Sequence, residues 1–186
     1  MSVGRRKEDK NGLFFITFTC GRYLSLFEQL NAYDLVYQWF NYLILKNHQI
    51  VSYVIMPNHL HVIINFRENK FNVDRWVSNG KRFMAYEIVK RLEKTNSMAV
   101  LEMLKQDVTL SDKQRGKHHQ VFIPSFDCKK ILDIDFLLQK IRYIHKNPVN
   151  KKWTLVKHFT EYKHSSASFY ENLEPRHPIL THYKDI

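Results

Sequence analysis

The sequence of 186 residues contains only two cysteines, Cys20 and Cys128, and they lie far apart. This scarcity excludes a disulfide scaffold and a zinc site built from cysteines. Glycine and proline occur five times each, and we find neither repeats nor low-complexity segments, so no obvious linker divides the chain. No apolar run approaches the ~18 residues that a membrane-spanning helix needs, which excludes a spanning protein.

Acidic residues are also few: 18 aspartates and glutamates face 29 lysines and arginines, which gives a net charge of +11. A chain this basic favours a polyanionic partner, and the 14% of aromatic residues offers surfaces for base stacking. The first twelve residues lack the apolar core of a signal peptide, so we expect a cytoplasmic protein. We expect a single domain over residues 1–186, with a core at about 12–148 and a basic C-terminal extension over 149–186.

The apolar patterns predict alternating strands and helices. We expect strands at 13–19, 49–56, 59–66 and 120–123, and helices at 28–47, 71–94 and 133–145. A Pro57-Asn58 break between two strands indicates an antiparallel hairpin, whereas the polar stretch 95–117 reads as an inserted loop with at most a short helix. This order is typical of an α+β, ferredoxin-like (split βαβ) sandwich: an antiparallel sheet with helices on one face and the first and third strands inside.

Two histidines provide the sharpest local feature. His59 and His61 alternate along an apolar strand, so their side chains share one face while Leu60 and Val62 share the other. Two imidazoles at this spacing suit a metal ion, although buried histidines also serve as hydrogen-bonded core residues. The residues alone leave both readings open.

A third ligand is available near the end of the last predicted helix. Tyr143 and Asn147 stand four residues apart and therefore share a helix face, just before Pro148. An amide oxygen suits Mg²⁺ or Mn²⁺, and a phenol beside the metal is a candidate nucleophile. The alternative is structural, because a tyrosine ring commonly covers a core and an asparagine commonly caps a helix.

Five segments resemble those of one protein family. VSYVIMPNHLHVIINF resembles the histidine–hydrophobic–histidine (HUH) strand of single-tyrosine HUH endonucleases, and IRYIHKNPVN resembles the tyrosine helix of REP-associated tyrosine transposases. FFITFTCGRYLSLF, NGKRFMAYEIV and FTEYKHSSASFY are similar to the first strand and its exit loop, a Lys-Arg-Phe helix and a Tyr-x-x-Ser-Ser-Ala segment. The resemblance spans roughly residues 12 to 170. The chain departs from the family at 120–124, where a Trp-Gln motif is usual, and in the long 95–117 insertion.

The resemblance implies an HUH-type fold and a metal-dependent endonuclease and strand transferase that acts on single-stranded DNA. It implies that His59, His61 and Asn147 hold Mg²⁺ or Mn²⁺, and that Tyr143 becomes linked to a 5′-phosphate. The implied substrates are hairpin-bearing repeat ends, and the branch favours a monomer over a homodimer that exchanges tyrosine helices.

Basic residues concentrate around these segments. Each lysine alone reads as a solvated charge, but clusters interleaved with aromatic residues such as Trp153 favour DNA. The predicted DNA-binding residues are Lys81, Arg82, Arg142, Lys146, Lys151 and Lys152.

Three other interpretations remain at this level. A non-catalytic nucleic-acid-binding module on the same scaffold explains the charge and aromatic content equally well. A self-mobilising insertion-sequence transposase shares the chemistry. A structural zinc site built on the histidine pair is weaker, because cysteines at suitable spacing are missing.

Overall fold

The computed structural model describes residues 11–67, 72–150, 152–173 and 178–186. Its strands are β1 (Gly12–Thr19), β2 (Gln49–Ile55), β3 (His59–Phe66) and β4 (Asp127–Lys130). Its helices are α1 (Leu26–Gln29), α2 (Tyr33–Leu45), α3 (Val73–Lys94), α4 (Met98–Gln106), α5 (Leu110–Gln114), α6 (Ile134–Lys146) and α7 (Ala167–Tyr170). Within these residues no helix is long and apolar enough to cross a membrane.

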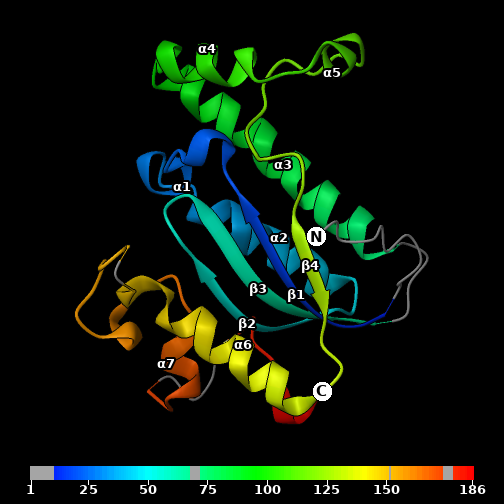
Figure 1. Cartoon of the computed structure of the whole chain (residues 1–186), viewed down its shortest axis with the longest axis vertical. Helices are drawn as coiled ribbons and strands as arrows, with labels where there is room; N and C mark the ends of the chain where they lie inside the picture. The colour runs from blue at the N-terminus through cyan, green and yellow to red at the C-terminus, as the bar shows by residue number, and fades with distance from the viewer. Residues whose placement is uncertain (1–10, 68–71, 151, 174–177) are drawn as a thin grey trace.

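The four strands form one antiparallel sheet in the order β2-β3-β1-β4 (Figure 1). β1 and β3 are therefore the inner strands, as the split βαβ pattern predicts. The β2–β3 hairpin closes at Pro57-Asn58, where the Met56 amide donates to the His59 carbonyl over 2.8 Å. This central position holds β3 rigidly between two neighbours.

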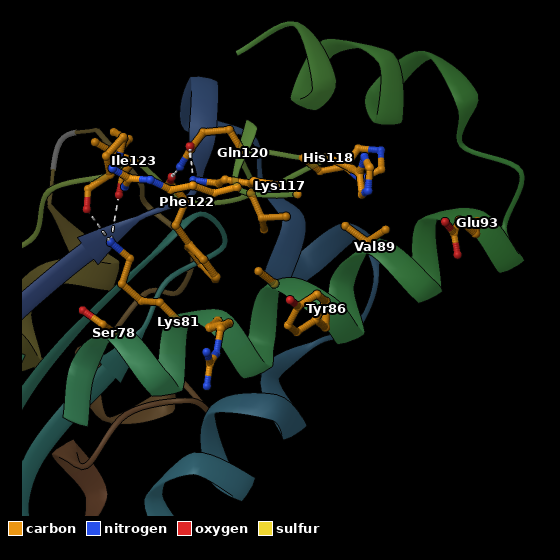
Figure 2. Close-up of a pocket in the computed structure, with 17 residues that line it drawn as sticks. Ser78, Lys81, Tyr86, Val89, Glu93, Lys117, His118, Gln120, Phe122 and Ile123 are labelled. Atoms are coloured by element: carbon orange, nitrogen blue, oxygen red, sulfur yellow. Dashed lines mark hydrogen bonds between the residues drawn. The ribbon is translucent and has the colours of Figure 1, made fainter. Parts of the chain in front are cut away.

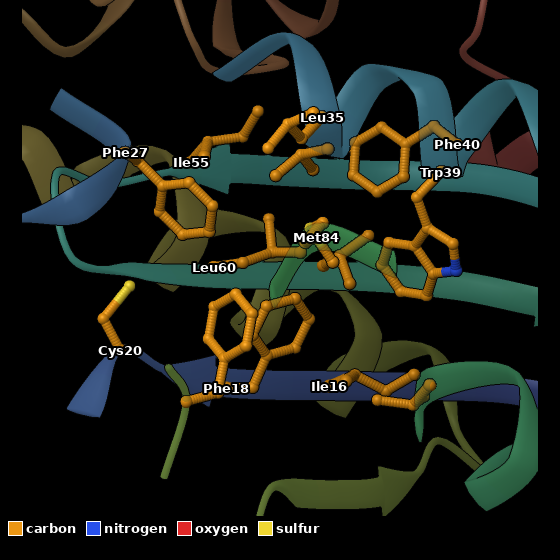
Figure 3. Packing of buried hydrophobic residues seen from close by; sticks show 14 of the residues in the cluster. Ile16, Phe18, Cys20, Phe27, Leu35, Trp39, Phe40, Ile55, Leu60 and Met84 are labelled. Atoms are coloured by element: carbon orange, nitrogen blue, oxygen red, sulfur yellow. The ribbon is translucent and has the colours of Figure 1, made fainter. Parts of the chain in front are cut away.

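Alternation along the strands divides the core into two layers. Phe18 on β1 and Leu60 on β3 point toward α2 and α3, where Trp39 and Met84 complete the larger cluster (Figure 3). Removal of this apolar surface from water is the main driving force that holds the two helices on the sheet. The prediction of helices on one face is confirmed for α2 and α3.

The third long helix lies on the opposite face, which corrects the prediction that all helices share one side. Ile141 and Ile144 of α6 pack against Phe15 and Val54, whose side chains alternate with those of the larger cluster (Figure 1). The Asp133 carboxylate caps this helix by accepting from the Phe136 amide over 2.7 Å. An α+β, ferredoxin-like sheet with helices on both faces results.

Three sequence-based boundaries were wrong. The predicted helix 28–47 is interrupted at Asn31, which adopts a left-handed φ of 45°, so α2 begins only at Tyr33. The fourth strand is not 120–123 but β4, although Phe122 forms a single bridge with Cys20. The stretch 95–117 contains two helices, α4 and α5, rather than a loop with at most one short helix.

The chain after α6 covers the free edge of β2. The Tyr162 and Tyr170 hydroxyls donate to the carbonyls of Ile55 and Val51, each over 2.9 Å. These contacts block an exposed edge that could otherwise pair with another strand. They also fix the segment that follows the candidate site.

Candidate active site at the β3–α6 face

Strand β3 places both histidines on the face that α6 covers. The ring centroids of His59 and His61 lie 4.8 Å apart, and the rings are inclined by 81°. Between them Leu60 points into the larger core cluster. The predicted shared face of the two imidazoles is confirmed.

Hydrogen bonds to Nδ1 orient both rings. The Asn58 amide nitrogen donates to the Tyr23 carbonyl over 2.9 Å, so the Asn58 oxygen is the atom that faces His59 Nδ1 at 2.6 Å. His59 therefore carries its proton on Nδ1 and an electron pair on Nε2. On His61, Nδ1 lies 2.6 Å from the Thr17 hydroxyl, which stands directly opposite on β1. Both rings are thus held by groups outside the candidate ligand set.

Helix α6 brings Tyr143 to the histidines. The Tyr143 ring contacts His61 edge to face, with centroids 5.1 Å apart, and it also contacts Phe15 at 6.1 Å. Its side chain is 49% exposed, so one side of the phenol packs and the other meets solvent. A nucleophile needs this combination of fixed position and access.

Asn147 follows α6 directly and is buried. A hydrogen bond from the protonated His59 ring to the Asn147 side chain would favour the charged form, which raises the pKa of that imidazole. An imidazolium only donates, so the amide oxygen of Asn147 is its partner. The Asn147 amide nitrogen is buried without a hydrogen-bond partner in the described part of the chain.

Burial keeps both histidines neutral at physiological pH. The pKa of His59 is lowered to about 4: burial is the main cause, Asn147 opposes the shift, and the charge of Lys152 adds to it. Burial also lowers the pKa of His61 to about 3, with smaller contributions from His59 and Lys140. Neutral imidazoles offer electron pairs rather than positive charge.

These groups fit a divalent cation. At neutral pH the electron pair on His59 Nε2 faces the amide oxygen of Asn147. Both atoms are acceptors, so neither can donate to the other, and a cation between them would bind to both. The described residues contain no group of three histidine, cysteine or acidic side chains suited to a metal, so the set of His59, His61 and Asn147 depends on its amide. Because none of these three donors is charged, a bound cation would keep its full charge for an anionic ligand.

Cationic side chains surround the site. The Lys140 ammonium lies 5.5 Å from the centroid of the Tyr143 ring and 5.0 Å from that of Phe15. Lys152 lies 6.0 Å from the Tyr23 ring, and the Trp153 ring is 5.9 Å from His59. The arrangement attracts an anion that also carries flat rings.

The predicted DNA-binding residues divide into two groups. Arg142 and Lys146 are exposed on α6, and Lys152 is exposed close to His59; Lys151 lies outside the described residues. Lys81 and Arg82 are instead on α3, on the opposite face of the sheet from the histidines. The Lys81 ammonium donates to the Ile123 carbonyl over 2.8 Å.

The sequence reasoning missed three residues that shape the site: Thr17, Asn58 and Lys140. Thr17 could have been found from the antiparallel register, since it alternates with Phe15 on the inner strand next to His61. Lys140 precedes Tyr143 by three residues and so lies on the same helix face. Asn58 was assigned only to the turn.

His145 is buried and has a different role. Its Nε2 lies 2.9 Å from the Ser166 hydroxyl and 3.2 Å from that of Ser52. Ser166 belongs to the Ser-Ser-Ala segment and its amide donates to the Tyr53 carbonyl over 2.9 Å. This network ties α6, β2 and the C-terminal segment together and so fixes the helix that carries Tyr143.

One solved structure shares the fold of this chain. A REP-associated tyrosine transposase bound to a REP hairpin matches all of this chain and 96% of its own, with a TM-score of 0.61 and 19% identity. A protein described as a candidate transposase from Deinococcus radiodurans matches 77% of this chain and 95% of its own, with a TM-score of 0.38 and 14% identity. No family model matches the sequence. No curated protein matches it either. The chain therefore has the fold of the REP-associated tyrosine transposase, which confirms the resemblance at the level of architecture.

Proposed function

We propose that the protein is a metal-dependent single-stranded DNA endonuclease and strand transferase of the transposase type. One observation carries the proposal: the half-exposed phenol of Tyr143 adjoins two neutral imidazoles and the buried amide of Asn147. A structural role for these residues would not require an accessible phenol. A phosphoryl-transfer site with a tyrosine nucleophile requires both an accessible phenol and an electropositive setting.

DNA with hairpin-bearing repeat ends is the substrate that this setting supports best. The REP-associated transposase of the same fold is bound to a REP hairpin. Here Lys140 supplies positive charge beside Tyr143 and Lys152 beside His59, and Trp153 supplies a stacking surface beside His59. Arg142 and Lys146 are exposed on the helix that carries Tyr143. Charge and stacking together are the usual means of holding single-stranded DNA.

In the proposed step the Tyr143 oxygen attacks the scissile phosphorus. A bond forms between the phenolic oxygen and phosphorus, and the bond from phosphorus to the 3′ oxygen breaks. The phenol loses its proton, the departing oxygen gains one, and the products are a 5′-phosphotyrosine and a free 3′ hydroxyl. A divalent cation held by His59, His61 and Asn147 would supply Lewis-acid activation of a non-bridging phosphate oxygen. Since the phosphodiester is conserved, reversal of the step rejoins DNA.

The test is formation of a covalent adduct. Full-length protein is incubated with Mn²⁺ and a panel of single-stranded DNAs that carry repeat-end hairpins, and products are separated on a denaturing gel. We expect a protein–DNA adduct whose tryptic peptide contains Tyr143. Tyr143→Phe should abolish the adduct and keep DNA binding, because phenylalanine preserves the ring contacts with His61 and Phe15.

Binding without an adduct across the panel, in protein shown to hold metal, would overturn the proposal and favour the non-catalytic module. An adduct that persists in Tyr143→Phe would show that another residue is the nucleophile.

A further inference from the structure

A cavity lies away from the histidine site. It has a volume of about 700 Å³ and lies between α3 and the segment 115–124 (Figure 2). α3 packs on the opposite sheet face from α6, so the sheet separates this cavity from Tyr143. Its size is in the range of small-molecule sites.

Hydrogen bonds hold the walls of the cavity in place. The Lys81 ammonium donates to the carbonyls of Ile123 and Pro124 over 2.8 and 3.2 Å (Figure 2). The backbone amide of Gln120 donates to the Leu104 carbonyl over 2.8 Å, and the backbone amide of Gly21 donates to the Val121 carbonyl over 2.7 Å. The segment is therefore tied to α3, to α4 and to the end of β1, and the cavity is preformed.

The lining is strongly basic. Its cations are Lys81, Arg82, Arg115 and Lys117, against a single acidic lining residue, Glu93. The guanidinium groups of Arg82 and Arg115 are exposed and have no partner within the described ranges. Burial and, to a smaller extent, the charge of Lys117 lower the pKa of Lys81 to about 8. Lys117 itself is paired with the Asp112 carboxylate over 3.2 Å, so the two arginines supply the free charge.

Aromatic and aliphatic groups complete the lining. The Tyr86 side chain is 64% exposed beside Val89, on the same helix as Arg82 and one turn beyond it (Figure 2). Val121 and Phe122 form the inner wall. A flat apolar surface next to free guanidinium groups matches a ligand that combines rings with phosphates.

The β4 edge of the sheet is also basic. On β4, Lys129 stands opposite Phe15, on the Tyr143 face. Burial and, to a smaller extent, the charge of Lys129 lower the pKa of Lys140. Lys130 stands opposite Phe14 and its ammonium lies 5.7 Å from that ring, on the α3 face. A DNA strand that leaves Tyr143 over the β4 edge would therefore meet positive charge on both faces of the sheet.

We propose that the α3 cavity is a second subsite for single-stranded nucleic acid, in which a base stacks on Tyr86 and phosphates contact Arg82 and Arg115. The choice of DNA as the ligand rests on the function proposed above, whereas the chemistry of the subsite is independent of Tyr143. The subsite holds an unpaired stretch outside the region that is cleaved.

Binding measurements test the subsite. Fluorescence anisotropy compares an unpaired oligothymidylate of about 30 nucleotides with one of about 6, which is too short to reach both sites. The double variant Arg82→Ala/Arg115→Ala should bind the long probe about tenfold more weakly, and its logarithmic salt slope should fall by about 1.4, for two lost phosphate contacts. Tyr86→Ala should weaken binding about fivefold, and Tyr86→Phe should restore it.

Lys94→Ala is the matched control, because it removes one exposed charge from the same helix outside the cavity lining. If Lys94→Ala weakens binding as much per charge as the double variant, or if the double variant binds like wild type, the subsite is refuted. Circular dichroism and melting temperature confirm that each variant folds.

Photocrosslinking locates the probe directly. A long oligonucleotide with iodo-deoxyuridine should give a crosslinked tryptic peptide that contains Tyr86, and Tyr143→Phe should leave that crosslink unchanged. Crosslinks confined to α6 and the residues after it would refute the subsite even if the Tyr143 adduct forms. Conversely, a Tyr86 crosslink without any adduct would support the subsite and refute only the proposed catalysis.

Discussion

The imidazole of His61 and the phenol of Tyr143 meet edge to face, with centroids 5.1 Å apart and an interplanar angle of 70°. An inner strand and a helix that packs on the same chain's sheet bring these two groups together. The candidate set is therefore complete within one chain and needs no helix from a second copy. We predict a monomer that forms the Tyr143 adduct, which light scattering on the active fraction will test; activity confined to a dimeric fraction would contradict this.

Thr17→Val should weaken metal binding by roughly 10- to 100-fold, because the Thr17 hydroxyl orients His61 through Nδ1. Valine keeps the shape of the side chain and removes only the hydroxyl. Titration of Mn²⁺ into the purified protein, followed by calorimetry, measures the effect. Thr19→Val is the control on the same strand face. Equal affinities for Thr17→Val and wild type would show that Thr17 does not position the ligand.

Lys140→Met should slow adduct formation by roughly 10- to 100-fold at saturating DNA, because it removes a cation next to the attacking phenol. Methionine retains an unbranched side chain over Phe15 and Tyr143, so the packing persists. Lys140→Arg should restore most of the rate. Single-turnover kinetics followed on a denaturing gel gives the rate of adduct formation. An unchanged rate in Lys140→Met would show that the charge of Lys140 does not contribute to the reaction.

The sequence predicted the parts of the fold that depend on local pattern. Alternation of apolar residues defined β3 to the residue, and Asp133 marked the start of α6. β4 escaped prediction because its sequence, DCKK, has no strand signal and pairs only because β1 presents a free edge. The apolar stretch around Val121 and Phe122 resembled a strand but is used to fill the core.

The candidate site shows the same division. His59, His61, Tyr143 and Asn147 follow from short spacings, and the structure brings them together as predicted. Their metal-binding and catalytic roles stay predictions. The placement of α6 opposite to α2 and α3 depends on which side of the sheet remained uncovered, which no local pattern encodes. Lys81 and Arg82 were therefore grouped with a site from which the sheet separates them.

Gly80→Ala should destabilise the fold by about 1 to 3 kcal/mol. A Cβ at Gly80 would lie 2.6 Å or less from two atoms of the buried Trp39 ring, so α2 and α3 approach closely only without it. The higher helix propensity of alanine does not offset this overlap, because the ring has no space to move. Urea unfolding measures the change, with Ser78→Ala as an exposed control on the same helix. A stability equal to wild type would show that the ring shifts freely.

His48 should make the protein less stable in mild acid. It is buried between Phe66 and Trp76, and its Nδ1 accepts from the Arg67 amide over 3.2 Å. Burial lowers the pKa of His48 from 6.5 to about 4. Between these values the unfolded chain binds a proton that the folded chain excludes, so the free energy of unfolding falls as the pH falls.

The contribution of His48 between pH 7 and pH 5 is about 2 kcal/mol. His48→Asn retains an acceptor for the Arg67 amide and removes the titration, so its unfolding free energy should depend less steeply on pH. Urea unfolding at pH 7 and pH 5, with a chelator present to prevent interference from metal, measures the pH slope of the unfolding free energy for wild type and for His48→Asn. His158→Asn, at an exposed histidine, is the control substitution. Because the other buried histidines remain in every variant, the difference in slope between wild type and His48→Asn isolates His48. Equal slopes for these two proteins would mean that the His48 imidazole protonates within the folded protein.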